Sequence, residues 1–524
     1  MKEVEDKSDW RAAFPSARTS DGYADVRTLI DDALDVMSGA GSRRGGPVTP
    51  GGPSATDEFT RKTLPDPLLA ETPAGTADER RARFRQLVES YVHWSVDVTH
   101  PATAARMQCP PTSVAVASET VTAALNQSLH AWEAGPFALA LEKHVVATLA
   151  GLVGYGPGAG GSLTAGGSLS NLMGIQLARD DAIARRLGRE RVGQGIAATG
   201  LRPVVLCTGA VHFSIGRGAA IAGIGEDSVV TVDSDRFGRM SPEGLDRALA
   251  GLPPDHLPVC VVVCAGATDL GWVDPLPELA AVARRHGVWL HADAAYGGGA
   301  LFSDRLRHLL DGIAEADSVT LDLHKFGWVP ASAGTFLVRD AEKLRYLECR
   351  TTMLNADDDA RLGYYGLYTE SLQATRRSDA LKIAATLHTM GRAGMGAMVE
   401  ACHDLAVHAA DRVAAEPRLE LVARPPLSAV LLRYLPRPSR RWPTADAFNS
   451  ELRRRLMAEG RLMLARNTVA QEDGSTAVFM KLMLLNPTIG TGDVDASVDH
   501  VLAVAEQMEH EAEEDGGQAE DGAA

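Results

Sequence analysis

The stretch SVTLDLHKFGWVP, residues 318–330, contains the features that decide how this chain folds. Its first part, Ser318 to Leu323, is short, mostly apolar and partly β-branched, which is typical of a strand buried on both faces. His324 and Lys325 follow directly. In an open α/β sheet, ligands bind at the carboxyl ends of the strands. The stretch therefore predicts a buried strand that delivers a histidine and a lysine to a ligand site.

Similar short apolar runs precede this strand and are separated by helical segments. They lie at 204–207, 228–232, 259–264 and 288–291, with helices expected near 114–131 and 137–153. Apolar strands that alternate with helices indicate a mostly parallel sheet covered by helices on both faces. Beyond residue 374 the pattern changes to long helices, expected over 378–390 and 397–415.

These patterns divide the chain into four parts. We expect an N-terminal arm over 1–111, with a helix near 77–96 and a flexible Gly/Pro-rich segment over 38–55. A large α/β domain over 112–374 and a small α+β domain over 375–509 follow. The acidic tail over 510–524 has no apolar periodicity, so it is predicted to be disordered.

Composition excludes several classes of protein. The 524 residues carry a net charge of −16, with 68 acidic against 52 basic residues, which disfavours nucleic acid and anionic membranes as partners. No apolar run approaches the length of a membrane-spanning helix, and six cysteines in so long a chain do not form a disulfide framework. The charged N-terminus lacks the apolar core of a secretion signal, so we expect a cytoplasmic protein with a small-molecule substrate.

Two other segments bring candidate ligand-binding groups. HADAAYGGG follows the predicted strand 288–291 and presents Asp293, while LTAGGSLSN presents Gly167 and Ser168 before a helix. A glycine-rich helix N-terminus is an anion site suited to phosphate. Each piece alone is more often structural: a turn, a cap or a solvated lysine. His291 and Asp293 have no third partner at a metal-ligand spacing, so no metal is expected.

Taken together, the segments resemble the group II pyridoxal 5′-phosphate (PLP)-dependent decarboxylases. The similarity runs from about Ala77 to Glu509. ALNQSLHAWE (124–133) and SLQATRRSDALKI (371–383) resemble most the branch that acts on diaminobutyrate and lysine. The resemblance implies the aspartate-aminotransferase-like fold (fold type I), with a mostly parallel seven-stranded sheet, an N-terminal helical arm and a small C-terminal domain. It also implies a homodimer whose active site lies at the interface.

The resemblance carries roles over to particular residues. It implies that Lys325 holds PLP as a Schiff base, that Asp293 keeps the pyridine nitrogen protonated, and that His212 stacks on the ring. These three are the expected catalytic residues. The full set of expected cofactor-binding residues is Gly167, Ser168, His212, Thr268, Asp293, Ala295, His324 and Lys325.

The chain departs from this family at two places. Met353 stands where relatives of the diamine branch carry a loop tyrosine thought to protonate the substrate α-carbon, and a thioether cannot donate a proton. Tyr364 and Tyr365 are the nearest alternatives. Near Asn126 and Glu133, candidates for the substrate pocket, Ala-Gly replaces the Gln-Ser of relatives, which leaves the substrate open.

Three functions follow, and the first is favoured. The enzyme decarboxylates an L-amino acid to an amine and CO2. Alternatively, because the loop tyrosine is missing, the electron-rich species formed after CO2 loss reacts with O2 and yields an aldehyde. The third reading is a PLP-binding relative without turnover, against which the joint presence of Lys325, Asp293 and His212 argues.

Overall fold

The computed structural model describes residues 15, 22–64, 76–348, 357–471 and 473–521. Contacts divide the chain into two compact units. The larger comprises Met107–Arg433 and Asn467–Thr491, and the other comprises Met1–Arg106, Tyr434–Arg466 and Gly492–Ala524. This division differs from the predicted domains, because much of the expected small C-terminal domain groups with the large sheet.

The larger unit contains a seven-stranded sheet with the order β2-β8-β7-β6-β5-β3-β4. Only β8 runs against its neighbours β2 and β7, and the other pairs are parallel. The predicted mostly parallel seven-stranded sheet is therefore confirmed, although the apolar runs located only five of its strands. The strands are β2 (Gly160–Thr164), β3 (Arg202–Cys207), β4 (Val229–Thr231), β5 (His256–Cys264), β6 (Trp289–Asp293), β7 (Ser318–Asp322) and β8 (Gly334–Val338).

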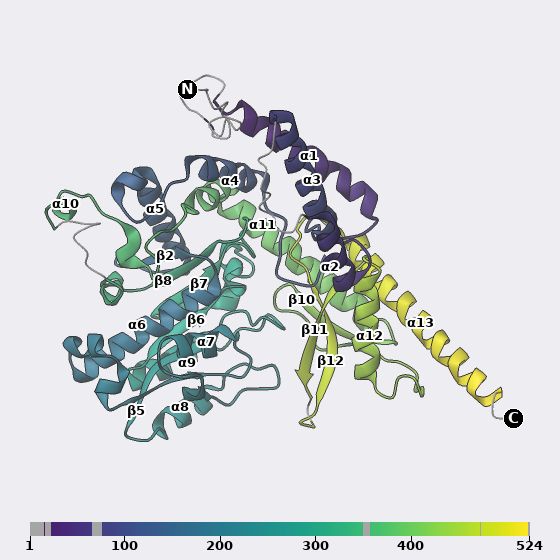
Figure 1. The fold of residues 1–524 in the computed structure, drawn as a ribbon. Helices are drawn as coiled ribbons and strands as arrows, with labels where there is room; N and C mark the ends of the chain where they lie inside the picture. Colours follow the sequence, from purple (N-terminus) through teal and green to yellow (C-terminus); the bar gives the residue numbers. More distant parts are fainter. Residues whose placement is uncertain (1–14, 16–21, 65–75, 349–356, 472, 522–524) are drawn as a thin grey trace, which may run out of the picture. The chain divides into compact units, whose positions relative to one another are not determined.

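Helices cover both faces of this sheet, as predicted, and β5 shows why. Val261 and Val263 belong to one apolar cluster, and the alternate residues Cys260 and Val262 belong to another. Successive side chains of a strand point to opposite faces, so an uninterrupted apolar run requires a cover on each side. The helix α6 (Gly167–Leu187) lies across one face, in contact with β5, β6, β7 and β8 (Figure 1).

The other helices of the larger unit include two that modify the predictions. α5 is apolar enough to cross a membrane by length and composition, but Leu139, Val146 and Leu149 are buried in the protein. The two long helices predicted after residue 374 form one, α11, which is kinked at Gly391 with φ +63°. The helices are α4 (Ser113–Leu125), α5 (Pro136–Val153), α7 (Ser214–Ile221), α8 (Pro242–Ala250), α9 (Leu276–His286), α10 (Asp357–Arg361) and α11 (Ala380–Ala414).

The larger unit also carries part of a smaller sheet. Its strands β9 (Leu419–Leu421), β10 (Ala429–Tyr434) and β12 (Thr476–Met483) are short, and β10 pairs antiparallel with β12. The indole of Trp328, in the stretch that follows β7, donates to the carbonyl of Leu485 beyond β12 at 2.9 Å. This bond anchors the loop after Lys325 to the rest of the unit.

The other unit is helical, and it corrects one prediction. The segment 38–55, expected to be a flexible loop, lies mostly in two helices. The helix α1 ends at Gly45, whose φ of +67° suits glycine, and a side chain on Gly46 would lie 2.2 Å from the carbonyl oxygen of Gly460. Close backbone packing therefore orders this glycine-rich stretch. The elements are α1 (Ala24–Arg44), α2 (Gly52–Thr63), α3 (Ala77–Trp94), β1 (Thr103–Ala104), α12 (Ala445–Ala458), β11 (Met463–Ala470, shared with the larger unit) and α13 (Thr491–Asp521).

The acidic C-terminal stretch is a second correction. It was predicted to be disordered from residue 510, but α13 continues to Asp521. Glu511 pairs with Arg455 of α12 at 2.7 Å, and Glu509 accepts the backbone N–H of Arg437 at 2.7 Å. Glu511 and Glu509 thus have basic and N–H partners in the same unit, which the local sequence does not show.

Candidate active site

A cavity of about 380 Å³ opens at the carboxyl ends of the central strands. Asp293 is the last residue of β6, and Asp322 is the last residue of β7. Every residue predicted to bind the cofactor lines this cavity, together with Asn171, Asp322 and Tyr296. A cavity of this size is in the range of small-molecule sites.

The lysine end of the cavity contains an ion pair. Lys325 Nζ lies 3.1 Å from Asp322 Oδ2, and His324 Nε2 lies 3.6 Å from the same oxygen. The Lys325 side chain is 19% exposed, so its amine is held at the cavity wall but is accessible. Burial lowers the pKa of His324 from its usual value, while Asp322 opposes this effect.

The carboxylate of Asp293 is held by two N–H donors. Its Oδ1 accepts the backbone N–H of Ala295 at 3.1 Å, and its Oδ2 accepts from Asn171 Nδ2 at 2.8 Å. Two donors on different elements leave the carboxylate little freedom to rotate. Its position suits the binding of a protonated ring nitrogen.

The imidazole of His212 lies at the same cavity. Its Nδ1 is 2.8 Å from Ser214 Oγ, and its ring contacts Phe213 with 4.2 Å between centroids. Burial lowers the pKa of His212, with Asp293 opposing and Lys325 adding to the effect. At neutral pH the ring is therefore uncharged, which suits it to stack on another flat ring.

The loop before α6 brings backbone to the cavity without side chains in the way. A Cβ on Gly167 would lie 3.1 Å from Asp322 Oδ2 and 3.2 Å from Ala295 Cβ. Gly166 precedes the helix with φ +154°, a conformation that glycine tolerates best. The glycines therefore leave space for a ligand at a helix N-terminus, as a phosphate requires.

Two polar atoms at the cavity also suit a polar ligand. Within the described part of the chain, no group hydrogen-bonds Asp322 Oδ1 or His324 Nδ1, although both atoms are buried. Buried polar atoms are nearly always paired in a native protein. A lysine amine, a fixed carboxylate, a neutral imidazole and a glycine cradle fit PLP, which has an aldehyde, a basic ring nitrogen, a flat ring and a phosphate.

A buried ion pair fixes the end of β2, the strand that leads into Gly166 and Gly167. Arg376 and Glu142 pair at 2.8 Å, and both are buried. Arg376 donates to the carbonyl of Leu163 at 3.0 Å, while Glu142 accepts the N–H of the same residue at 3.2 Å. Leu163 lies near the end of β2, just before the two glycines. The segment SLQATRR therefore contributes to the site indirectly, because its Arg376 hydrogen-bonds the backbone of β2.

The residues predicted for the substrate pocket and the loop do not line this cavity. Asn126 ends α4 with a left-handed φ of +47°, and Glu133 is exposed. Tyr364 lies edge-on against Trp132, with 5.1 Å between centroids, and the ring of Tyr365 lies under Lys143. Met353 lies outside the described residues.

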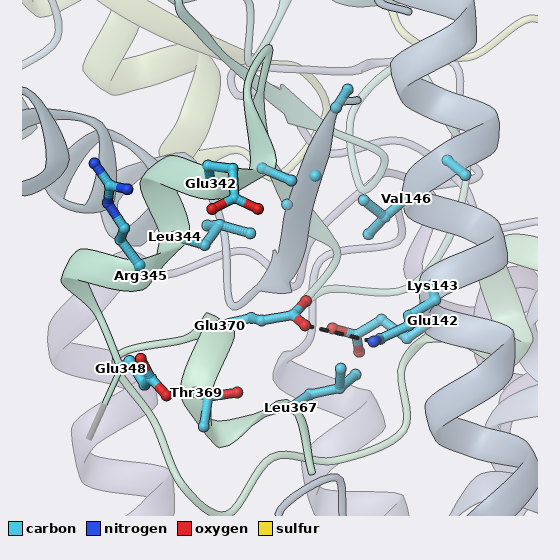
Figure 2. A pocket seen from close by; sticks show the side chains of 15 residues that line it. Glu142, Lys143, Val146, Glu342, Leu344, Arg345, Glu348, Leu367, Thr369 and Glu370 are labelled. Atoms are coloured by element: carbon cyan, nitrogen blue, oxygen red, sulfur yellow. Dashed lines mark ion pairs between the residues drawn. The ribbon is translucent and has the colours of Figure 1, made fainter. Parts of the chain in front are cut away.

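A second cavity, of about 410 Å³, lies elsewhere in the larger unit (Figure 2). It is lined by charged residues that include Glu142, Lys143 and Glu370, and Lys143 Nζ lies 3.5 Å from Glu370 Oε1. The predicted cofactor residues are not among those that line it. We therefore place the chemistry in the first cavity.

Sequence reasoning missed three residues of the site. Asn171 contacts Asp293, Ser214 contacts His212, and Asp322 contacts Lys325. Each lies within a segment already singled out: one helical turn after Gly167, two residues after His212, and inside LDLHK. Proximity in sequence to a predicted site residue was the signal that could have found them.

Comparison with known proteins agrees with this site. Residues 75–435 match the pyridoxal-dependent decarboxylase conserved domain. The chain is 37% identical over 484 residues to an L-2,4-diaminobutyrate decarboxylase from Rhizobium meliloti (strain 1021), covering 92% of this chain and 91% of the relative. It is 33% identical over 435 residues to a protein of the same name from Acinetobacter baumannii, covering 81% and 84%.

A solved structure agrees as well. It is the glutamate decarboxylase domain of diaminobutyrate-pyruvate transaminase and L-2,4-diaminobutyrate decarboxylase from Vibrio parahaemolyticus. The TM-score is 0.82 at 27% identity, covering 95% of this chain and 99% of that one. With every predicted cofactor-binding residue at one cavity that fits PLP, the chain belongs to the pyridoxal-dependent decarboxylase family and is a PLP-dependent amino acid decarboxylase.

Proposed function

We propose that this enzyme removes the α-carboxyl group of L-2,4-diaminobutyrate and releases CO2 and propane-1,3-diamine. The observation that carries the substrate is the 37% identity, over more than nine-tenths of both chains, to a relative named for this activity. The balance is simple: the carboxylate leaves as CO2, and one proton takes its place on the α-carbon.

In this proposal the site residues take the roles that their geometry suits. Lys325 Nζ holds the cofactor aldehyde, Asp293 binds the ring nitrogen, and Gly167 and Ser168 receive the phosphate through backbone and hydroxyl donors. When bound, PLP draws electron density from the substrate α-carbon, so that the bond to the carboxylate can break. Asp322 Oδ2 lies 3.1 Å from Lys325 Nζ and holds that amine at the cavity wall.

The product is expected to be the amine, because proton-bearing groups line the cavity. Lys325 and His212 are both at its wall, and Lys325 is the candidate to protonate the α-carbon after CO2 leaves, because a neutral imidazole would have to become an anion to do so. The absence of a loop tyrosine at Met353 supports the alternative, in which O2 accepts two electrons and becomes hydrogen peroxide, and water then releases the aldehyde and ammonia. The two outcomes are distinguished by hydrogen peroxide, which forms only in the second.

A panel of amino acids tests substrate and product together. With PLP-loaded enzyme in air, L-2,4-diaminobutyrate should give the highest kcat/KM among diaminobutyrate, ornithine, lysine, glutamate and cysteine sulfinate. We expect one amine per CO2 and no peroxide above a catalase-treated control. A higher kcat/KM for another amino acid would refute the proposed substrate. Peroxide equal to CO2 would refute the amine product, and Met353→Tyr should then lower the ratio of peroxide to CO2.

We also propose that the enzyme is a cytoplasmic homodimer. The location rests on the sequence grounds given above. The dimer is supported by large apolar side chains that lie exposed on segments carrying the substrate candidates: Leu125, Trp132, Phe137 and Tyr364 are 58%, 38%, 72% and 45% exposed. Asn126 and Glu133, which do not line the cavity of their own chain, would then serve the partner's site.

A charged residue on this surface tests the dimer. Phe137→Glu should convert the dimer to a monomer in sedimentation velocity and lower kcat, because burying an unpaired carboxylate costs several kcal/mol. Tyr91→Glu is the control, since Tyr91 is 76% exposed on α3 of the other unit. A wild-type protein that sediments as a monomer while fully active would refute the proposal.

A further inference from the structure

Asn171 of α6 connects more site residues than any function assigned above requires. Its Nδ2 donates to Asp293 Oδ2 at 2.8 Å and to Ser214 Oγ at 3.0 Å. Its Oδ1 lies 2.9 Å from Thr320 Oγ1 and 3.0 Å from His291 Nε2. All four hydrogen-bonding positions of the amide are therefore used, in a side chain that is 1% exposed.

The directions of these bonds follow from chemistry alone. An ionised carboxylate can only accept, so the NH2 group of Asn171 must face Asp293. The amide oxygen then faces Thr320 and His291 and can only accept, so both must donate to it. His291 therefore carries a proton on Nε2.

The far side of His291 closes the network. His291 is fully buried, and burial lowers its pKa to about 4, so the ring is neutral and its Nδ1 has no proton. Nδ1 accepts from Ser318 Oγ at 2.7 Å, and Ser318 Oγ accepts the indole N–H of Trp289 at 2.9 Å. Gly174 makes this packing possible, since a Cβ there would lie 2.6 Å from His291 Nδ1. The amide of Asn171 cannot flip without breaking this chain of donors.

The same amide determines the proton on His212. Ser214 Oγ accepts from Asn171, which leaves the single hydroxyl proton of Ser214 free to donate to His212 Nδ1 at 2.8 Å. The backbone N–H of Ser214 also points at this nitrogen, at 3.3 Å. Two donors on one nitrogen leave no place for a proton there, so a neutral His212 carries its proton on Nε2.

We propose that Asn171 is a positioning residue that orients the Asp293 carboxylate and, through Ser214, places the proton of the His212 imidazole on Nε2. The position of the proton is argued from the hydrogen bonds alone, and only its role toward the substrate rests on the proposed function. An Nε2–H can donate a hydrogen bond to a substrate carboxylate, whereas a proton on Nδ1 would be directed at Ser214. The network thus links Asp293, assigned to the ring nitrogen of PLP, to His212, assigned to the face of that ring.

Several charged groups act on His212 besides this network. Asp293 at the end of β6 and Asp322 at the end of β7 favour the imidazolium form, while Lys325 and Arg217 of α7 oppose it. Burial outweighs the carboxylates and lowers the pKa of His212. The neutral form is therefore present above this lowered pKa and is lost as the pH falls through it.

The first test uses the unmodified protein. Nitrogen-15 NMR of the full-length, PLP-loaded enzyme with labelled histidine reports which ring nitrogen is protonated. Because the chain has 15 histidines, the signals are assigned with His212→Gln and His291→Gln. We expect both residues to be neutral with the proton on Nε2 at pH 7.5. A proton on Nδ1 of either ring would overturn the proposal, whatever the substrate is.

The second test removes the amide. In Asn171→Leu, a side chain of similar size, Ser214 Oγ loses the donor from which it accepts, so its oxygen can accept from a protonated His212. The midpoint of the His212 titration should rise by about 1 pH unit or more, and the acidic limb of kcat/KM should shift with it. Ser170→Ala is the matched control, because Ser170 is buried on the same helix but bonds Thr164. An unchanged midpoint in folded Asn171→Leu would refute the inference.

Discussion

Replacing Lys325 with alanine is expected to abolish turnover, with a loss of about 10⁴-fold or more in kcat. The amine of Lys325 lies in the cavity and is the group that we assign to the covalent bond with PLP. Without it, PLP can bind only through its phosphate, ring and nitrogen contacts. The fold should survive, since the ion pair lost with Asp322 is at a cavity wall rather than in the apolar core. Release of ¹⁴CO2 from carboxyl-labelled substrate measures the loss.

The attachment site itself can be mapped. Borohydride reduction of the wild-type enzyme should leave the pyridoxyl group on the peptide that contains residue 325. Lys143→Ala is the control, because Lys143 lines the other cavity and pairs with Glu370 (Figure 2). It should keep normal turnover and labelling. Label on a different lysine, or covalent PLP in Lys325→Ala, would show that the assignment is wrong.

Asp293→Asn is expected to lower kcat by about 10²–10⁴-fold while PLP still binds. The amide keeps the shape of the side chain but removes the negative charge that favours a protonated ring nitrogen. The contact with Asn171 Nδ2, now 2.8 Å, can be kept because the new side chain retains one oxygen acceptor. The expected pattern is therefore a defect in kcat rather than in cofactor affinity.

Two measurements separate this effect from damage to the fold. Fluorescence titration should give a PLP dissociation constant within about tenfold of wild type, and the melting temperature should be nearly unchanged. Asp304→Asn, an exposed carboxylate paired with Arg392, is the control and should leave kcat unchanged. If Asp293→Asn decarboxylated at a near-normal rate, the charge of Asp293 would have no part in the chemistry.

Much of the fold was predictable because the relevant signals are local. The apolar runs of β5 and β7 are continuous, since both faces of these strands are buried, and such runs are visible in the sequence. β2 and β8 were not located, because GGSLT and GTFLV are short and begin with glycine. The segment 38–55 is predicted to be a loop because of its glycines and prolines, while packing of Gly46 on Gly460 orders the chain there.

The site divides in the same way. The sequence by itself determined that Lys325 and Asp293 follow buried strands and that a glycine-rich turn precedes a helix, because each depends on one short segment. The joint resemblance of these segments to one family implied PLP. Only the tertiary structure decided which residues touch. Asn171 and Asp293 are 122 positions apart, yet their side chains lie 2.8 Å apart. The proton positions on His212 and His291 follow from donors on α6, α7, β6 and β7. Such hydrogen bonds join segments that are far apart in the sequence, so no local sequence pattern predicts them.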